Sequence, residues 1–235
     1  MKTQDVNTVK KVSQYKITEI FESIQGEGVF TGKWVTFVRF YGCNLKCPFC
    51  DTQIDKYKRL TLTGIMKRVK ELGNDIVVFT GGEPTIQIDL PLLRMFRKSK
   101  YQLHIESNGA TECIANENGQ LINKMFTMWH YFNWVTISPK YHNGYMLADV
   151  SSLERADEVK LLVDTKLSIE ELKQRITEVR EYFQNGTIFL QPIEASGHTE
   201  ENTKYVYNLL RLLEHEKWDA NVMLNIQIHK ILNVR

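Results

Sequence analysis

The sequence predicts an α/β protein built as a partial TIM-like barrel, a (β/α)6 core with one extra strand at each end of the chain. Six short runs rich in β-branched and aromatic residues alternate with longer segments, several of which carry helical periodicity. Of the 235 residues, 43% are hydrophobic and 25% are charged, which is typical of a globular protein with a sizeable core. Collagen-like, coiled-coil and disordered classes are thereby excluded.

The six runs are expected to form parallel strands, because crossover segments separate them along the chain. They are Trp34–Phe40, Ile76–Thr80, Tyr101–Glu106, Trp134–Ser138, Glu158–Val163 and Thr187–Gln191. In an α/β barrel ligands gather at the carboxyl ends of the strands, so the motifs that carry chemistry are expected there.

Helical periodicity predicts the crossover helices. Apolar residues recur at helical spacing over residues 62–72, and Gly73 stands where a C-terminal cap belongs. Ser168 and Glu171 form a capping box that opens another helix, which closes at Asn185-Gly186. Two further helices are expected at residues 90–98 and 199–215.

One more strand is expected on each side of the six, at Tyr15–Ser23 and at Val222–His229. In the second, apolar residues alternate with Asn225, Gln227 and His229, whose polar face is expected to look into the barrel. No repeat and no Pro- or Gly-rich linker marks a boundary. We therefore expect one domain over residues 15–235, preceded by an N-terminal extension of residues 1–14.

Charge and targeting signals restrict the partners. The 30 basic and 28 acidic residues are mixed along the chain and give a net charge of +2, so no basic stripe indicates a nucleic acid. The polar N-terminus lacks the apolar core of a signal peptide, and no run reaches the roughly 18 apolar residues of a membrane helix. A cytoplasmic protein with a small-molecule partner is expected, with neither a nucleic acid nor a membrane. In that reducing compartment its four cysteines do not indicate disulfides.

Three of those cysteines, Cys43, Cys47 and Cys50, lie within eight residues directly after the first of the six strands. Three thiolates can hold a 4Fe–4S cluster and leave one iron open to a ligand, which would imply catalysis. Two alternatives stay open at this point. One is a zinc site completed by the distant Cys113, and the other is a redox pair of Cys47 and Cys50.

A second motif, Gly81-Gly82-Glu83-Pro84, ends the next strand. Glycines allow the backbone to approach a ligand closely, and Glu83 offers a carboxylate for an ammonium group, although Gly-Gly also occurs in simple turns. The Cys-x3-Cys-x2-Cys spacing and this motif, each after a strand, together resemble the radical S-adenosylmethionine superfamily.

Further segments resemble one family within it, the 7-carboxy-7-deazaguanine synthases. The resemblance runs from about Tyr15 to the last residue, and only residues 111–133 within that stretch lack a clear counterpart. The segments that carry it are Ser23–Gly28, Arg39, Cys50–Thr52, Glu106–Gly109, Ser138–Lys140, Gln191–Pro192 and Gln227–Asn233.

The resemblance implies a radical lyase. Members of the family reduce S-adenosylmethionine at a 4Fe–4S cluster and form a 5′-deoxyadenosyl radical, which takes a hydrogen from C6 of 6-carboxy-5,6,7,8-tetrahydropterin. The ring then contracts and loses ammonia to give 7-carboxy-7-deazaguanine, as in queuosine-type 7-deazapurine biosynthesis. The resemblance also implies Mg²⁺, an external electron donor such as a flavodoxin, and a homodimer. The protein orients and shields the reactants and supplies charge, whereas the cofactors carry the chemistry.

The same resemblance assigns ligand-binding residues, with no catalytic side chain apart from them. Cys43, Cys47 and Cys50 would hold the cluster, and Thr52 would bind Mg²⁺. The S-adenosylmethionine site would comprise Gly82, Glu83, Glu106, Ser138, Pro139, Lys140, Gln191, Pro192, Ile193 and Glu194. The substrate site would comprise Ile24, Gln25, Gly26, Arg39, Thr80 and Arg235. Arginine can grip a carboxylate through two hydrogen bonds, and a terminal α-carboxylate can accept from pterin N–H groups.

The chain departs from the family pattern at two of these segments. Ser107 stands where threonine is commoner, which keeps the hydroxyl. Arg235 stands where a small residue or proline is usual, so its side chain has no assigned role. The aromatic stretch at residues 125–134 is expected to pack in the core, with a dimer contact as the alternative.

Two other functions compete with the synthase. A glycyl-radical-enzyme activase uses the same cysteine spacing, although Gln25–Gly28 and His229-Lys230 argue against it. A non-catalytic iron–sulfur or zinc module would only bind a partner, and iron and zinc analysis would separate it from an enzyme.

Overall fold

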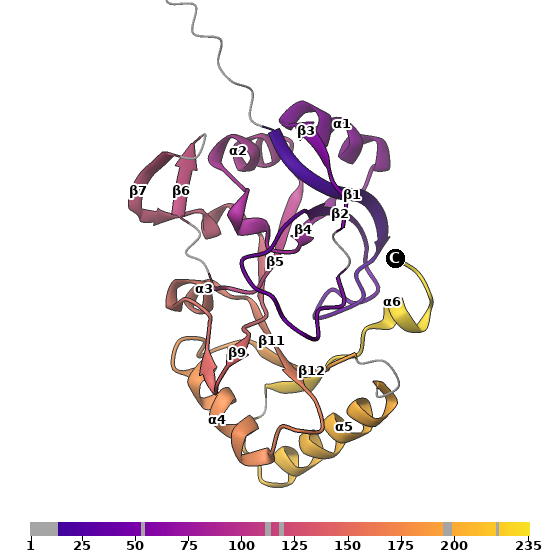
Figure 1. Cartoon of the computed structure of the whole chain (residues 1–235), viewed down its shortest axis with the longest axis vertical. Coiled ribbons are helices and arrows are strands. Elements are labelled where there is room, and N and C mark those ends of the chain that lie inside the picture. The colour runs from indigo at the N-terminus through magenta and orange to yellow at the C-terminus, as the bar shows by residue number, and fades with distance from the viewer. Residues whose placement is uncertain (1–13, 53–54, 111–113, 118–119, 195–198, 220) are drawn as a thin grey trace, which may run out of the picture.

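The sheet at the centre of the molecule joins nine strands in the order β13-β12-β11-β8-β5-β4-β2-β1-β3. The structure is a computed structural model that describes residues 14–52, 55–110, 114–117, 120–194, 199–219 and 221–235. Seven strands of this sheet, β2, β4, β5, β8, β11, β12 and β13, run parallel. At one edge β1 (Gln14–Ile24) pairs antiparallel with β2 and with β3 (Lys58–Thr61). Figure 1 shows this curved sheet with helices around it. The predicted α/β class and partial barrel are confirmed.

All six predicted parallel strands are present. They are β2 (Trp34–Phe40), β4 (Ile76–Gly81), β5 (Gln102–Ser107), β8 (Trp134–Ile137), β11 (Glu158–Val163) and β12 (Thr187–Pro192). Most of their residues are buried on both faces of the sheet, as parallel strands covered by helices require. The register pairs Arg39 with Thr80 and Glu106 with Thr136, so the carboxyl ends meet at one edge.

The predicted helices are also present, as α1 (Leu62–Leu72), α2 (Leu90–Lys98), α4 (Ile169–Arg180) and α5 (Thr199–His215). Gly73 ends α1 in the left-handed conformation, at φ 78°. Both hydrogen bonds of the Ser168–Glu171 capping box form at the start of α4, a motif that typically contributes about 1 kcal/mol. This helix ends at Arg180, before a turn that buries Phe183 in the core.

Several short elements were not predicted. Between β5 and β8 the chain forms a hairpin of β6 (Ile114–Glu117) and β7 (Gln120–Thr127) instead of a helix, and Figure 1 shows it beside α2. The others are β3, η1 (Pro84–Ile86), η2 (Met128–Tyr131), β9 (Tyr141–His142), β10 (Tyr145–Met146) and α3 (Val150–Arg155). These pieces are too short for a periodic pattern to reveal.

The prediction of a strand over Val222–His229 is wrong beyond its first three residues. Strand β13 covers Val222–Leu224, and α6 (Ile228–Ile231) follows after a short irregular segment. The ladder stops because Pro192 on the neighbouring β12 has no N–H to continue it. Instead, the amide of Ile228 donates to the carbonyl oxygen of Gly26 at 3.1 Å, which turns the chain toward β1.

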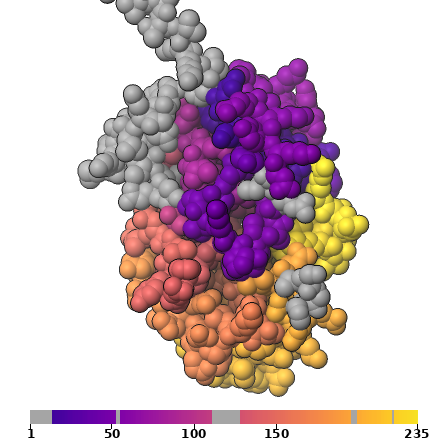
Figure 2. Space-filling model, in the orientation of Figure 1, coloured from indigo at the N-terminus to yellow at the C-terminus, as the bar shows by residue number. Residues whose placement is uncertain are grey.

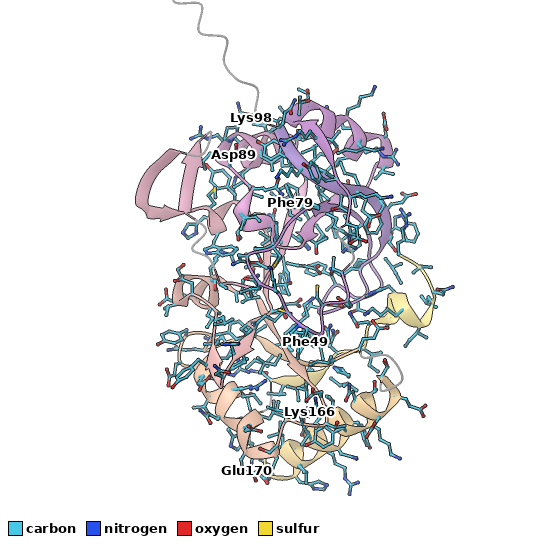
Figure 3. All side chains as sticks on the ribbon, viewed as in Figure 1. Phe49, Phe79, Asp89, Lys98, Lys166 and Glu170 are labelled. Carbon is cyan, nitrogen blue, oxygen red and sulfur yellow. The ribbon has the colours of Figure 1, made fainter. Side chains whose placement is uncertain are left out.

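An aromatic cluster fills the core around Phe79, which Figure 3 labels. The Phe79 ring makes edge contacts with Phe40, Phe96 and Phe132 at centroid distances of 5.3, 5.1 and 6.2 Å. Met128, Trp129 and Phe132 are buried in this core, so the core prediction for the aromatic stretch is confirmed at these positions. No helix of the described residues is long and apolar enough to cross a membrane.

Candidate active site

A cavity of about 610 Å³ opens at the carboxyl ends of the parallel strands, a size typical of small-molecule sites. Figure 2 shows the C-terminal end of the chain, in yellow, lying against the N-terminal elements beside it. Eighteen of the predicted site residues line the cavity: Ile24, Gln25, Gly26, Arg39, Cys43, Cys47, Cys50, Thr52, Thr80, Gly82, Glu106, Ser138, Lys140, Gln191, Pro192, Ile193, Glu194 and Arg235.

The three cysteines follow β2 on a loop that forms one wall of the cavity. Their thiols are free, with Cys43 and Cys50 exposed and Cys47 half-buried. Burial raises the pKa of the Cys47 thiol, the neighbouring Lys140 opposes this shift, and Cys43 and Cys50 add to it. Cys113, on which the zinc alternative depends, lies outside the described residues.

Gly82 lets the next loop rest directly on the cysteine loop. The Gly82 amide donates to the Phe40 carbonyl at 3.1 Å, and the Glu83 amide donates to the Gly42 carbonyl at 2.8 Å. A Cβ on Gly82 would overlap the Gly42 carbonyl and crowd Cys43, so this position requires glycine for space. The motif is therefore a close junction with the cysteine loop and not a simple turn.

Two predicted residues, Glu83 and Pro139, do not line this cavity. The Glu83 side chain is fully buried and accepts hydrogen bonds from the Ser107 and Thr85 hydroxyls, at 2.8 and 2.7 Å, and from the amides of Thr85 and Asn108. Burial raises the pKa of the Glu83 carboxyl above its usual value, although each of these hydrogen bonds lowers it. Because its carboxylate is engaged within the protein, it holds the loop after β5 instead of facing the cavity.

A buried ion pair that sequence reasoning missed lies at the base of the cavity. The Lys160 ammonium on β11 donates to Glu27 at 2.6 Å and lies 3.6 Å from Glu106. Burial would raise the pKa of Glu27, but the charge and hydrogen bond of Lys160 hold it below its usual value. Burial likewise opposes the charged form of Lys160, and Glu27 and Glu106 raise its pKa. Lys160 gave no motif signal, because a lysine within an apolar strand has no pattern of its own.

Glu106 connects this pair to the predicted substrate residues. Its carboxylate accepts from the Thr80 hydroxyl at 2.8 Å and from the Gln25 side-chain amide at 3.0 Å. The main-chain amide of Gln25 is already engaged, donating to Lys33 at 2.7 Å, and the Gly26 carbonyl accepts from Ile228. A carbonyl oxygen keeps a second lone pair, so the Gly26 carbonyl can still accept one more hydrogen bond.

Lys140 is fixed beside the cysteine loop. Its ammonium donates to the Ser138 carbonyl at 2.6 Å and to the Ser138 hydroxyl at 2.7 Å. Burial lowers the pKa of Lys140 to about 8, against the opposing effect of Cys47. Ser138 and Lys140 thus form one polar corner of the cavity.

The tail of the chain returns to the cavity. Gln227 and His229 line it, as predicted for the polar face, although helix α6 rather than a strand carries His229. His229 packs so closely on Gly26 that a Cβ there would overlap its ring. Asn225 lies behind this wall, where its side chain accepts from the Gly28 amide and donates to Gln191.

Lys230 ties three segments of the cavity together. Its ammonium donates to Asp51 at 2.5 Å, to Gln227 at 2.8 Å and to Glu194. Burial alone would lower the pKa of Lys230, but the Asp51 and Glu194 carboxylates raise it above its usual value. Burial would likewise raise the pKa of Asp51, but the hydrogen bond and charge of Lys230 hold it below its usual value. The cysteine loop, the loop after β12 and the tail are thus joined at one cation.

The chain is similar to known proteins along most of its length. The model of the radical SAM superfamily matches residues 37–213. A 7-carboxy-7-deazaguanine synthase from Bacteroides thetaiotaomicron is 34% identical over 94% of this chain and 98% of its own length. One from Haemophilus influenzae is 31% identical over 94% of both chains. The crystal structure of QueE from Escherichia coli superposes with a TM-score of 0.66 at 26% identity, over 91% of this chain and 94% of that one.

The fold and the cysteine loop place the chain in the radical S-adenosylmethionine superfamily. Within it, the chain belongs to the 7-carboxy-7-deazaguanine synthase family, a family of lyases. These relatives do not favour the activase or the non-catalytic module.

Membership implies a 4Fe–4S cluster and S-adenosylmethionine. The residues present fit both groups. Three free thiols line the same cavity, and the close junction at Gly82 brings a second backbone segment beside Cys43 without a side chain in between. Thiolates are the usual protein ligands of such clusters.

Proposed function

We propose that the chain converts 6-carboxy-5,6,7,8-tetrahydropterin into 7-carboxy-7-deazaguanine with loss of ammonia, in 7-deazapurine biosynthesis. The observation that carries the proposal is a single cavity that brings together three free thiols, Arg39 and the chain's last residue. The family of the curated relatives supports the same activity. A cytoplasmic homodimer that receives its electron from an external donor such as a flavodoxin completes the proposal.

When bound at Cys43, Cys47 and Cys50, the cluster supplies with S-adenosylmethionine the one-electron chemistry that removes a hydrogen atom from C6 of the pterin. The residues of the chain bind and orient. Arg39 grips the substrate carboxylate, and Thr80 and residues 24–26 contact the pterin edge. Gly82, Glu106, Ser138, Lys140 and residues 191–194 form the cofactor wall. Glu83 and Pro139 support that wall from behind.

We assign Mg²⁺ to Thr52, whose hydroxyl lies on the cavity wall 3.5 Å from the Asp51 carboxylate. Hard oxygen donors suit Mg²⁺, which keeps several waters and shares substrate oxygens, so one protein ligand suffices. The ion would fix and polarise those oxygens. We expect Thr52→Ala to lower turnover and to weaken its response to added Mg²⁺. Full activity of the wild type in a chelator would contradict this assignment.

The proposed reaction is tested by anaerobic incubation of the reconstituted protein with S-adenosylmethionine, a reductant, Mg²⁺ and the carboxytetrahydropterin. The deazaguanine should form and be detected by mass, with ammonia as the second product. Cluster content without any product would overturn the proposed reaction.

The cluster ligands are tested by single substitutions in the same assay. Alanine at Cys43, Cys47 or Cys50 should abolish both bound iron and product, because each thiolate holds a different iron. Cys113→Ala serves as the matched control and should keep both. Loss of iron in the Cys113 variant, with iron retained in Cys47→Ala, would show that the assignment is wrong.

A further inference from the structure

Two arginines and one glutamate meet on the cavity wall, and the family pattern accounts for only part of this group. The Arg39 Nε donates to Glu19 Oε1 at 2.9 Å, and Arg235 Nη1 lies 3.3 Å from Glu19 Oε2. Both guanidinium groups lie over the ring of Phe21, at 5.5 and 5.8 Å from its centroid. Glu19 was not among the predicted site residues, and the side chain of Arg235 had no assigned role.

The sheet register fixes the first of these contacts. Glu19 on β1 pairs directly with Arg39 on β2, so the two side chains lie side by side on one face. Among the described residues, Nε is the only nitrogen of Arg39 with a hydrogen-bond partner. Its terminal nitrogens Nη1 and Nη2, which form the fork that matches a carboxylate, are therefore left for a ligand on the cavity side.

The second contact anchors the end of the chain. The main-chain oxygen of Arg235 accepts a hydrogen bond from the Ser23 hydroxyl, and its guanidinium pairs with Glu19. Ser23 and Glu19 lie four residues apart on β1 and so share one face of the strand. The Arg235 side chain is 72% exposed, so its ion pair is weak on its own and depends on the main-chain contact.

We propose that Glu19 is a positioning residue that couples Arg39 and Arg235 into one carboxylate-recognition unit. It holds the Arg39 guanidinium through Nε, with the fork toward the substrate carboxylate, and it docks the last residue beside Arg39. This inference rests on the proposed function, since it concerns how the carboxylate of that substrate is recognised.

Charge supports the coupling. The α-carboxylate of Arg235 lies at the same place, so two guanidinium groups and two carboxylates carry no net charge. Without the Arg235 guanidinium the group would carry −1 and would repel an anionic substrate, so the side chain compensates its own main chain. A small final residue provides no such compensation.

The test compares two ligands on the reconstituted enzyme with S-adenosylmethionine bound. One is the 6-carboxytetrahydropterin, and the other is tetrahydropterin without the 6-carboxylate, used as a competitive inhibitor. We expect Glu19→Gln to weaken binding of the carboxylated ligand about tenfold and Arg235→Ala about threefold. Neither substitution should change binding of the carboxylate-free ligand. Arg235→Lys should keep most of the affinity that Arg235→Ala loses. The double variant, Glu19→Gln with Arg235→Ala, should bind the carboxylated ligand as weakly as Glu19→Gln alone.

Each outcome decides the proposal. Equal losses for both ligands would indicate a structural role for Glu19, and additive losses in the double variant would mean that the two arginines act separately. Either result overturns the inference while wild-type turnover keeps the proposed function. A wild type that neither binds nor converts the carboxypterin overturns the proposed function itself. Glu71→Gln, which breaks the exposed Arg68–Glu71 pair on α1, is the matched control. The Arg235 variants lie at the last residue and leave the fold intact.

Discussion

Lys160 is a charged residue buried in the middle of strand β11, where two carboxylates compensate its charge. Its ammonium is paired with Glu27 and lies close to Glu106, both on the same cavity. A buried ion pair rarely adds net stability, because the cost of desolvation offsets the attraction. Removal of one partner is nevertheless destabilising, because it leaves the other charge buried without compensation. The pair is therefore better understood as a device that fixes Glu27 and Glu106, and through Glu106 the Thr80 and Gln25 side chains, in one arrangement.

His104 makes stability depend on pH at the residue scale. It is buried on β5, and its ring packs on Phe30 at 4.5 Å. Burial lowers its pKa from 6.5 to about 4, against the opposing carboxylates of Glu106 and Asp157. The unfolded chain therefore binds a proton between pH 6.5 and 4 that the folded chain does not, so stability falls as the pH drops through this window.

We expect the free energy of unfolding of the wild type to fall by about 2 kcal/mol as the pH drops from 6.5 to 5. The His104→Leu variant should not show this loss. Urea unfolding of the wild type and the variant over pH 7.5 to 5 measures the difference in slope. The same substitution at the exposed His215 is the control and should keep the wild-type slope. Parallel curves for wild type and His104→Leu would contradict the prediction.

At the scale of elements, the cavity is assembled from loops and held by few side chains. The parallel strands present their carboxyl ends at one edge, but the cysteine loop, residues 193–194 and the tail after β13 have no ladder to hold them. Glu83 fastens the loops after β4 and β5 from below, and Lys230 fastens the cysteine loop to the tail and to Glu194. These two residues replace the secondary structure that the loops lack.

Lys230→Met is expected to lower kcat/KM about tenfold with iron content unchanged, because Asp51 and Glu194 would then face each other without a cation. The loss should appear in the KM of both S-adenosylmethionine and the pterin, since the joined loops serve both. Steady-state kinetics with iron analysis measures it. Lys173→Met, which breaks the exposed Lys173–Glu216 pair, is the matched control. An effect confined to iron content would mean that Lys230 supports the cluster alone.

Across the whole molecule, the sequence predicted the periodic secondary structure and missed single residues whose partners are distant along the chain. Regular periods placed the six parallel strands and four helices, and the rule for strand ends brought most site residues to one cavity. The alternation at residues 222–229 imitated a strand, because nothing local shows that Pro192 on β12 would end the ladder. Glu19 and Lys160 were missed because their meaning lies in partners that are distant along the chain. Glu83 was placed in the right motif, but its burial depends on three-dimensional packing.

The last residue, Arg235, contacts the first strand of the sheet, β1. Arg235 lines the cavity and is attached to Ser23 and Glu19 on β1, whereas chain ends usually fray at the surface. Three residues appended after Arg235 would convert its α-carboxylate into a neutral peptide group and push additional chain into the cavity. We expect the KM for the pterin to rise or turnover to vanish with cluster content intact, because the extension removes the negative charge and one of the two acceptor oxygens and occupies the substrate's space. The same three residues at the N-terminus are the control and should leave the kinetics unchanged. Unchanged kinetics for the C-terminal extension would place the terminal carboxylate outside the substrate site.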